Sequence, residues 1–320
     1  MTSKTYSRRE FLAASAALAA GTALHLKATP TPAPAESIID LHQHVEYRGR
    51  TDAQLLTHQR AMGVTTTILL PAGRPVKRPS THDGVANGLQ AKAAGNEACY
   101  RYAQEHSPRK EFFWGACEVP DLDDAVPEIE KWLKKGAVII GELKFGVECD
   151  SPEMQKIYVL ARAYNVPVLM HWQHGMYNYG FDRFHTMLEK YPQVNFIGHA
   201  QTWWANIDKG YKNWTDLYPK GAVEAGGLTD RYLRDYPNMF GDLSAGSGLG
   251  ALTRDEEHTR AFFDRHQDKL IYGSDCADPV GPPDDCQGAK TIAVVRRLAK
   301  NKAVERKLLF GNAQKLLRIL

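Results

Sequence analysis

The chain has 320 residues, with 40 Lys and Arg against 37 Asp and Glu, a formal net charge of +3. Four of these basic residues and one acidic residue fall in residues 1–35, so the other 285 residues carry 36 charges of each sign. A neutral domain offers no electrostatic footprint for nucleic acid or for an anionic membrane. We therefore expect a small-molecule substrate and no nucleic-acid partner.

Residues 1–35 have the pattern of an export signal. Ser7–Leu12 reads Ser-Arg-Arg-Glu-Phe-Leu, a twin-arginine pattern, and a weakly apolar stretch, too short for a comfortable membrane span, follows it. The tract ends in Ala33-Pro34-Ala35, where small side chains suit a signal peptidase. We expect recognition by the twin-arginine export machinery, a periplasmic or cell-envelope location, and no membrane anchor after cleavage. The alternative is a chance arginine pair before an ordinary Ala-rich helix.

From residue 36 onward, short apolar runs alternate with longer amphipathic ones. Most of the apolar runs are rich in Val, Ile, Phe or Leu and are bounded by Gly, Pro, Asp or His, which is typical of buried parallel strands. These runs are Ser37–Leu41, Val64–Leu70, Phe112–Val119, Ala137–Phe145, Val166–Met170, Val194–Gly198, Met239–Leu243 and Lys269–Tyr272. Helices are expected at Ala53–Met62, Val85–Glu105, Asp123–Lys135, Pro152–Tyr164, Phe181–Tyr191, Arg254–His266 and Gly288–Lys300.

Eight strands that alternate with helices indicate an α/β fold, a (β/α)8 TIM barrel that occupies residues 36–320 as one catalytic domain. A doubly wound open sheet is the alternative, but it usually has a Gly-rich phosphate loop after its first strand. Here the first strand ends in His42-Gln43-His44 instead. We expect Gln201–Tyr236 to form an inserted loop with one or two helices, and Ala313–Leu320 to form a short closing helix.

Four of the expected strands end in side chains that bind metals. His42 and His44 are two residues apart, so on an extended strand both point to the same face, here the barrel interior. His171, His199 and Asp275 follow three other strands. The active site of a TIM barrel lies at the carboxyl ends of its strands. The pattern therefore predicts a site for Zn²⁺ or a similar divalent ion with an open water position, although a lone His-x-His would be weak evidence.

In this order the motifs resemble the amidohydrolase superfamily, and most of all its branch with aminocarboxymuconate-semialdehyde decarboxylase and related non-oxidative decarboxylases. The resemblance covers most of residues 37–320 and rests on His42-Gln43-His44, His171, His199, Gly273-Ser274-Asp275 and the ending Leu309–Ala313. It implies one or two divalent ions, most simply Zn²⁺. The positions that match metal ligands of the family are His42, His44, His171 and Asp275.

The same resemblance implies two catalytic roles. Asp275 would also take a proton from the metal-bound water, whose pKa the ion lowers. His199 matches a ligand of the second metal in binuclear members, whereas in mononuclear members this residue polarises the substrate or moves a proton.

The fourth strand leaves three alternatives open. Glu142 and Lys144 lie on one face of the run Ala137–Phe145. Some members of the superfamily use a Glu there as a metal ligand, and others use a Lys carboxylated by CO₂, because a free ammonium cannot bind a metal. The third alternative is a buried Glu142–Lys144 ion pair beneath the site.

Aromatic residues crowd the loops after the fifth and sixth strands. We expect Trp172, Trp203 and Trp204 to pack against a flat substrate and His174 to line its pocket, with plain loop packing as the alternative. Asp40, two residues before His42, is expected to point inward below the metal and to orient its ligands.

The five cysteines form no CxxC pair, and we expect all of them to be structural. If the protein is exported, Cys276 and Cys286 are one candidate disulfide pair by their proximity in sequence.

Three functions are compatible with these residues. The first is a metal-dependent hydrolase that attacks an amide, lactone or ester carbonyl. The second is a non-oxidative decarboxylase of a small aromatic or unsaturated carboxylic acid, which is a carbon–carbon lyase. The third is a non-catalytic exported binding protein, which would have no need of both Asp275 and His199.

Overall fold

The computed structural model describes residues 36–82, 93–106, 111–279 and 286–320. The expected export signal lies outside the described residues, and so does the first part of the helix expected over Val85–Glu105. The chain divides into Met1–Glu36 and a compact unit, Ser37–Leu320, and the description below concerns the second unit. Within the described residues, no helix has both the length and the apolar character that a bilayer crossing requires.

The described part of Ser37–Leu320 contains eight parallel strands, and each overlaps one of the eight apolar runs in the sequence. They pair in chain order, as β1-β2-β3 and as β4-β5-β6-β7-β8. Their bounds are β1 (Ile39–Gln43), β2 (Thr66–Leu69), β3 (Phe112–Trp114), β4 (Ile140–Leu143), β5 (Val168–His171), β6 (Phe196–His199), β7 (Met239–Asp242) and β8 (Leu270–Ile271).

Backbone hydrogen bonds close these strands into a barrel. The amide of Val138 donates to the Trp114 carbonyl over 2.9 Å, and this bond joins the β3 edge to β4. The amide of Leu41 donates to the Tyr272 carbonyl over 3.1 Å, and this bond joins β1 to the segment after β8. The fold is therefore the α/β (β/α)8 barrel that the sequence predicts.

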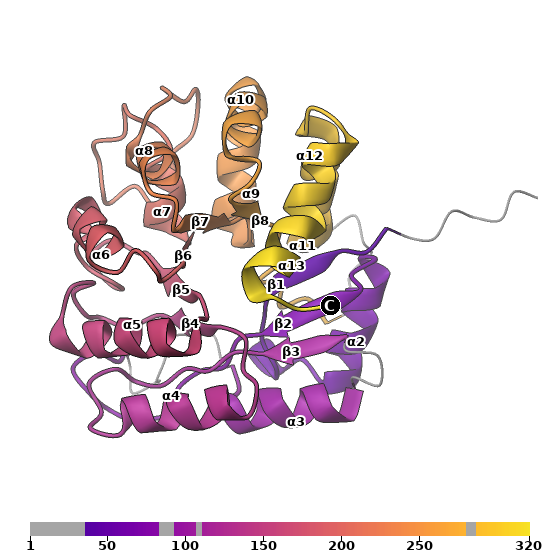
Figure 1. The fold of residues 1–320 in the computed structure, drawn as a ribbon. Helices are drawn as coiled ribbons and strands as arrows, with labels where there is room; N and C mark the ends of the chain where they lie inside the picture. The colour runs from indigo at the N-terminus through magenta and orange to yellow at the C-terminus, as the bar shows by residue number, and fades with distance from the viewer. Residues whose placement is uncertain (1–35, 83–92, 107–110, 280–285) are drawn as a thin grey trace, which may run out of the picture. The chain divides into compact units, whose positions relative to one another are not determined.

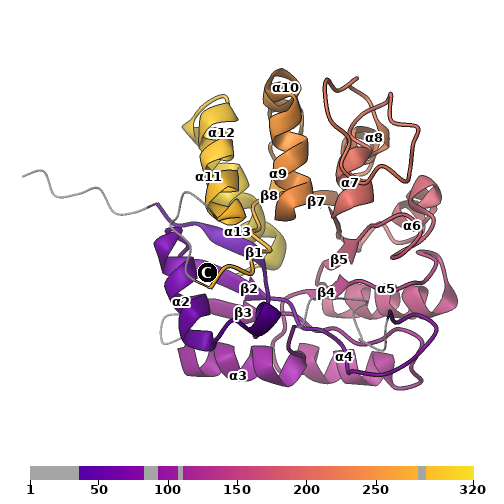
Figure 2. The same ribbon diagram turned by 180° about the vertical axis from the view of Figure 1, so that it is seen from behind.

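Helices surround the strands, as the opposite views in Figure 1 and Figure 2 show. The α-helices are α2 (Asp52–Ala61), α3 (Asn96–His106), α4 (Ala125–Lys134), α5 (Pro152–Tyr164), α6 (His185–Lys190), α7 (Gln201–Ala205), α8 (Leu228–Asp235), α9 (Ala245–Arg254), α10 (Glu256–His266), α11 (Gln287–Leu298), α12 (Lys302–Arg306) and α13 (Asn312–Leu317). Short helical turns of other types are η1 (Tyr47–Gly49), η2 (Phe181–Arg183) and η3 (Lys307–Gly311).

Most of these helices were predicted, and two of them, α7 and α8, lie in the irregular segment Gln201–Tyr236 as expected. The sequence reasoning missed α9, because Gly246, Gly248 and Gly250 weaken its helical pattern. Gly248 has a packing reason: a Cβ there would lie 2.4 Å from the carbonyl oxygen of Leu243, so only glycine allows this approach.

Side chains of the strands alternate between two apolar layers. One layer faces the surrounding helices, and the other fills the barrel and includes Ile39, Leu41, Ile68, Leu70, Ile139, Leu169, Ile197 and Ile271. Ala313, Leu316 and Leu317 of α13 belong to this interior cluster, so the predicted closing helix seals one end of the barrel. Each buried leucine stabilises the fold by about 1.5–3 kcal/mol.

Two strands contain an irregularity that matters for the site. The register of β1 against β2 shifts by one residue between Asp40 and Gln43. The register of β4 against β5 shifts in the same way between Ile140 and Leu143. Since a one-residue shift moves the following side chains to the opposite face, the polar residues after each shift turn into the barrel mouth.

Candidate metal centre

His42 of β1 and His44 directly after it aim the same ring nitrogen at one point. His42 Nε2 and His44 Nε2 lie 3.2 Å apart, and both residues are buried. His42 Nδ1 lies 2.7 Å from Asp242 Oδ2, and His44 Nδ1 lies 2.7 Å from the Leu70 carbonyl oxygen. Because these partners accept hydrogen bonds from Nδ1, it is the Nε2 atom of each ring that faces the position of a metal.

Glu142 of β4 lies between two pairs of histidines. Its Oε2 atom is 3.4 Å from both His42 Nε2 and His44 Nε2. Its Oε1 atom is 2.6 Å from His171 Nδ1 and 3.7 Å from His199 Nε2. One carboxylate thus faces two neighbouring positions where a cation could bind.

Asp275, which follows β8, reaches both positions from the opposite side. Its Oδ1 atom lies 3.6 Å from His44 Nε2 and 3.9 Å from His42 Nε2. Its Oδ2 atom lies 3.7 Å from His199 Nε2. Asp275 has a φ of 45°, a left-handed conformation that Asp adopts more readily than most residues.

This donor set fits a divalent ion. Ligands of a four-coordinate Zn²⁺ lie 2.0–2.2 Å from the ion, and hence roughly 3.3–3.6 Å from one another. The distances from His42 Nε2 and His44 Nε2 to each other, to Glu142 Oε2 and to Asp275 Oδ1 run from 3.2 to 3.9 Å. Among the described residues, two buried atoms of the site, Asp275 Oδ1 and His199 Nε2, have no hydrogen-bond partner.

His171 does not join His42 and His44, with which the sequence grouped it. Instead Glu142, His171 and His199 form a second group whose donor atoms lie within 4.8 Å of one another. Burial and then the charge of Lys144 lower the pKa of His171 to about 3, so its ring is neutral. A second ion would be held here, with Glu142 and Asp275 shared between the two positions.

The charges of the site favour a cation. Burial lowers the pKa of His42, but the nearby carboxylates of Asp275, Glu142 and Asp242 outweigh burial and raise this pKa well above its ordinary value. Burial raises the pKa of Glu142, whereas the charges of Lys144 and His42 hold it well below its usual range. The site therefore combines ionised carboxylates with a strong preference for positive charge at its centre.

The sequence reasoning missed two residues that hold the histidines. Asp242, the last residue of β7, accepts from His42 Nδ1 and lies 3.2 Å from His199 Nδ1. The hydroxyl of Ser244 donates to Asp242 Oδ2 over 2.7 Å and lies 3.0 Å from His199 Nδ1. The sequence could have indicated Asp242, because it is a polar residue at the end of a buried strand, as His171 and His199 are.

Asp40 does not lie where the sequence placed it. Its carboxylate accepts a 2.9 Å hydrogen bond from Gln59 of the outer helix α2 and a 2.8 Å bond from the Ser274 amide. It also accepts from the backbone amide of His42 over 3.0 Å. The expectation that it points inward is wrong, because the register of β1 shifts between Asp40 and Gln43. Asp40 ties β1 to the segment after β8 through their backbones.

A cavity of about 750 Å³ opens beside the donor atoms, and its lining includes His171, His199 and Asp275. Lys144 lines it too, with Nζ 5.4 Å from the centre of the Tyr177 ring. Burial lowers the pKa of Lys144. Of the two candidate ligands on the fourth strand, Glu142 is the one whose side chain lies among the histidine nitrogens.

The three tryptophans expected to bind substrate are core residues. Trp172 packs on Phe184, with ring centres 4.8 Å apart, and is fully buried. The ring of Trp203 occupies the space beside Gly198, where a Cβ would stand 2.3 Å from the indole. Trp204 is buried and donates to the Asp242 carbonyl over 3.1 Å. None of the three lines the 750 Å³ cavity, so this expectation is corrected.

His174 was expected in the pocket wall and lies beside a neighbouring cavity instead. That cavity, of about 440 Å³, is lined by His174, Trp214 and Arg183 among others, and it shares Gln173 with the larger one. The His174 ring lies 5.7 Å from the Trp214 ring, centre to centre.

The fold and the site together define a (β/α)8 barrel with a centre of histidines and carboxylates at the carboxyl ends of its strands. The model of the family described as amidohydrolase matches residues 39–319. The chain belongs to the amidohydrolase family, whose members are enzymes that bind divalent metal ions.

Solved structures share this fold at low sequence identity. A probable 2-pyrone-4,6-dicarboxylic acid hydrolase from Acinetobacter baumannii, with citric acid bound, aligns with a TM-score of 0.56 and 14% identity, over 88% of this chain and 99% of its own. The 2,6-dihydroxybenzoate decarboxylase from Rhizobium aligns with a TM-score of 0.52 and 15% identity, over 88% and 99%. A dihydroxybenzoic acid decarboxylase from Polaromonas sp. JS666, with manganese and 2-nitroresorcinol bound, gives 0.52 and 14%, over 88% and 97%. No curated protein sequence matches the chain.

Proposed function

We propose that the protein is a metal-dependent hydrolase that uses water to attack a lactone, ester or amide carbonyl in a substrate that carries a carboxylate. The observation that carries this proposal is the position of Asp275 and His199. Both face the cation-binding donor atoms, they lie 3.7 Å apart, and both line the 750 Å³ cavity.

Asp275 and His199 suit the two proton transfers of hydrolysis. The reaction needs a base for the proton of the attacking water and an acid for the leaving group. Asp275 Oδ1, which has no hydrogen-bond partner among the described residues, takes that proton. His199 keeps its own proton on Nδ1 toward Asp242, so its Nε2 atom can relay a proton to the leaving oxygen or nitrogen.

A bound divalent ion supplies Lewis-acid activation of the carbonyl and lowers the pKa of water. We propose Zn²⁺ because nitrogen and carboxylate donors at these separations suit it. His42, His44, Glu142 and Asp275 would hold one ion, and a second would lie between His171 and His199.

The cavity points to an anionic substrate. Lys144 and Arg48 both line it, close to the site where the carbonyl would lie. A buried ammonium can bind a carboxylate strongly, because the hydrogen bond joins two opposite charges. Tyr47 and Tyr177 offer ring faces in the same cavity, which suits a planar or unsaturated acid.

The test is a panel of carboxylated lactones, esters and amides with protein reconstituted with Zn²⁺ or Mn²⁺. Hydrolysis of a lactone or ester releases a proton at neutral pH, which a pH-stat records, whereas decarboxylation releases CO₂. We expect proton release that chelation abolishes and Zn²⁺ restores. The matched control is the double variant His42→Ala/His44→Ala. Full activity in that variant would contradict the proposal.

A non-oxidative decarboxylase of a small aromatic or unsaturated acid is the second candidate. The observation that favours it is the combination of Lys144, which can bind a carboxylate, with the rings of Tyr47 and Tyr177 in one cavity. CO₂ release without net proton release from a carboxylated phenol would replace the hydrolase proposal with this one. No observation favours the third reading, a binding protein without turnover.

We also propose export through the twin-arginine machinery and a periplasmic or cell-envelope location, on the sequence pattern of residues 1–35. Cell fractionation tests both. A mature protein found unprocessed in the cytoplasm would contradict them.

A further inference from the structure

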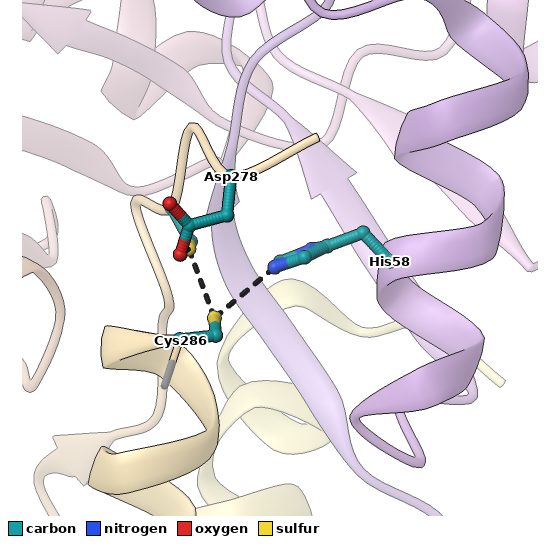
Figure 3. A group of neighbouring side chains, drawn as sticks. His58, Asp278 and Cys286 are labelled. Atoms are coloured by element: carbon teal, nitrogen blue, oxygen red, sulfur yellow. Dashed lines mark hydrogen bonds between the residues drawn. The ribbon is translucent and has the colours of Figure 1, made fainter. Parts of the chain in front are cut away.

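A second group of metal-binding side chains lies on the other side of the Asp275 segment. His58 belongs to α2, Cys276 and Asp278 follow β8, and Cys286 directly precedes α11. The donor atoms of these four residues lie within 4.8 Å of one another. In Figure 3, His58 and Asp278 approach Cys286 from different sides. We call this group the sulfur cluster.

The contacts within the sulfur cluster converge on its two sulfur atoms. Cys276 Sγ and Cys286 Sγ are 2.9 Å apart. His58 Nε2 lies 3.1 Å from Cys286 Sγ, and Asp278 Oδ2 lies 3.1 Å from Cys276 Sγ. Cys276, Cys286 and His58 are at most 2% exposed, so three of the four donors are shielded from water.

We propose that His58, Cys276, Asp278 and Cys286 form a second, structural Zn²⁺ site that nothing in the amidohydrolase chemistry of the barrel requires. Two thiolates, one imidazole and one carboxylate are four donors of the types that a closed, tetrahedral zinc site uses. With Zn–S near 2.3 Å and Zn–N near 2.0 Å, tetrahedral donors lie roughly 3.4–3.8 Å apart. The side chains reach that spacing by moving apart by less than about 1 Å, the scale of a small rotamer adjustment.

A zinc ion explains why His58 and Asp278 lie against the two sulfur atoms better than a Cys276–Cys286 disulfide does. A disulfide would remove both thiols and leave the buried Nε2 atom of His58 facing neutral sulfur. Nδ1 of the same ring already has no hydrogen-bond partner among the described residues. A buried polar group without a partner costs about 1–3 kcal/mol. Coordination, in which the two thiols lose their protons, gives Nε2 a strong partner and places the carboxylate of Asp278 directly against the ion.

A metal in the sulfur cluster would hold the segment that carries Asp275 in place. Cys276 is the next residue, and its carbonyl oxygen accepts from Arg50 Nη1 over 2.7 Å and from Gln43 Nε2 over 3.0 Å. Zinc bound to Cys276 would fasten the same segment to α2 through His58 and to α11 through Cys286. These residues are positioning residues, because they act on the reaction only through the placement of Asp275.

The first experiment is X-ray absorption at the zinc edge on the full-length protein, purified without chelator and loaded with Zn²⁺. We expect a Zn–S shell near 2.3 Å, about the Zn–thiolate distance, beside the nitrogen and oxygen shells. The nitrogen- and oxygen-only centre of the barrel cannot produce that shell. A fully loaded protein with only nitrogen and oxygen neighbours around zinc would overturn the proposal. So would peptide mass spectrometry that finds a Cys276–Cys286 disulfide in the native protein.

Variants then locate the sulfur-bound ion. In Co²⁺-substituted protein, we expect a thiolate-to-cobalt charge-transfer band that Cys286→Ser removes together with one metal equivalent per chain. His42→Ala/His44→Ala should keep the band. The matched control is Cys149→Ser, since Cys149 is also buried and already donates to the Gly180 carbonyl, as a serine hydroxyl can. A band that survives Cys286→Ser at full strength would contradict the assignment, and the absorption measurement decides the case if that variant does not fold.

Discussion

The two groups of donors in this barrel differ in how they are built and in how open they are. The donors around the cavity, which we call the strand-end cluster, are His42, His44, Glu142, His171, His199 and Asp275. They come from five strands, consist of nitrogen and oxygen alone, and adjoin a cavity of about 750 Å³. The sulfur cluster comes from α2, the segment after β8 and the start of α11, and contains two thiols.

This difference separates a reactive metal position from a stabilising one. A catalytic metal takes water or substrate beside its protein ligands, by expanding to five-coordinate where four are present, whereas a structural metal is enclosed by four protein ligands. The strand-end cluster lies on a rigid frame, since four of its donors lie in hydrogen-bonded strands and the other two, His44 and Asp275, follow such strands. The sulfur cluster joins α2, the segment after β8 and the residue before α11, so a metal there would link segments that lie outside the sheet.

The largest expected effect is a loss of activity on removing the histidines of the strand-end cluster, which should leave the sulfur cluster intact. In His42→Ala/His44→Ala, the strand-end cluster loses two nitrogen donors and therefore its zinc, and we expect activity to fall by at least about 1,000-fold, because the metal contributes several kcal/mol to the transition state. Plasma mass spectrometry should still find the ion of the sulfur cluster. A variant with no zinc at all would mean that the two clusters are not independent.

The next effect measures the stability that the sulfur cluster contributes. In the His42→Ala/His44→Ala background, Zn²⁺ at a hundred times its Kd should stabilise the fold by about 2.7 kcal/mol. For a domain of this size that raises Tm by about 5 °C in differential scanning calorimetry. Adding Cys286→Ser should abolish the rise, and adding Cys149→Ser should leave it intact. An equal rise in both triple variants would place the stabilising zinc elsewhere.

A smaller effect concerns the residue that orients the histidines. Asp242→Asn removes the anionic acceptor of the His42 and His199 Nδ1 protons, and we expect zinc affinity of the strand-end cluster to fall about 10–100-fold, as for other changes behind a metal ligand. Competition with a chromophoric chelator measures it. The exposed Asp235→Asn is the control, because Asp235 pairs with Arg234 on the surface. An unchanged affinity would show that Asp242 does not orient these rings.

The smallest expected effect is a change in KM, and it tests whether Lys144 binds the carboxylate of the substrate. Lys144→Met should raise KM for a carboxylated substrate about tenfold, because a hydrogen bond to a charged group contributes about 1.5–3 kcal/mol. KM for an uncharged ester analogue and the metal content should not change. If zinc is lost instead, Lys144 is a carboxylated ligand, and the alternative that the sequence left open is the correct one.

The strand-end cluster could be predicted in large part from sequence. Buried parallel strands are recognisable as short apolar runs, and a polar residue such as His171 or His199 directly after a run must lie at the barrel mouth. The register shifts in β1 and β4 could not be predicted, because they depend on pairing with β2 and β5. That is why Asp40 was placed on the wrong face.

Tertiary packing hid the remaining features. Trp172 and Trp203 follow the same strands as the histidines, but their rings pack in the apolar core rather than in the cavity, and sequence distance alone does not distinguish the two positions. The sulfur cluster was equally hidden, since His58 and Cys286 are 228 residues apart and nothing in the sequence of α2 marks His58 as a ligand. Of this cluster, the sequence indicated only the proximity of Cys276 and Cys286.

The closing helix α13 has a consequence for the order in which the protein can mature. Its leucines complete the interior cluster that Ile39 and Leu41 of β1 begin, so the earliest strand and a helix that follows all eight strands share one core. While the ribosome is still translating, the barrel lacks this seal, and its inner leucines and isoleucines stay open to water and to chaperones. A stop codon just before Asn312 would spare every donor of both clusters and yet leave a chain that proteolysis removes.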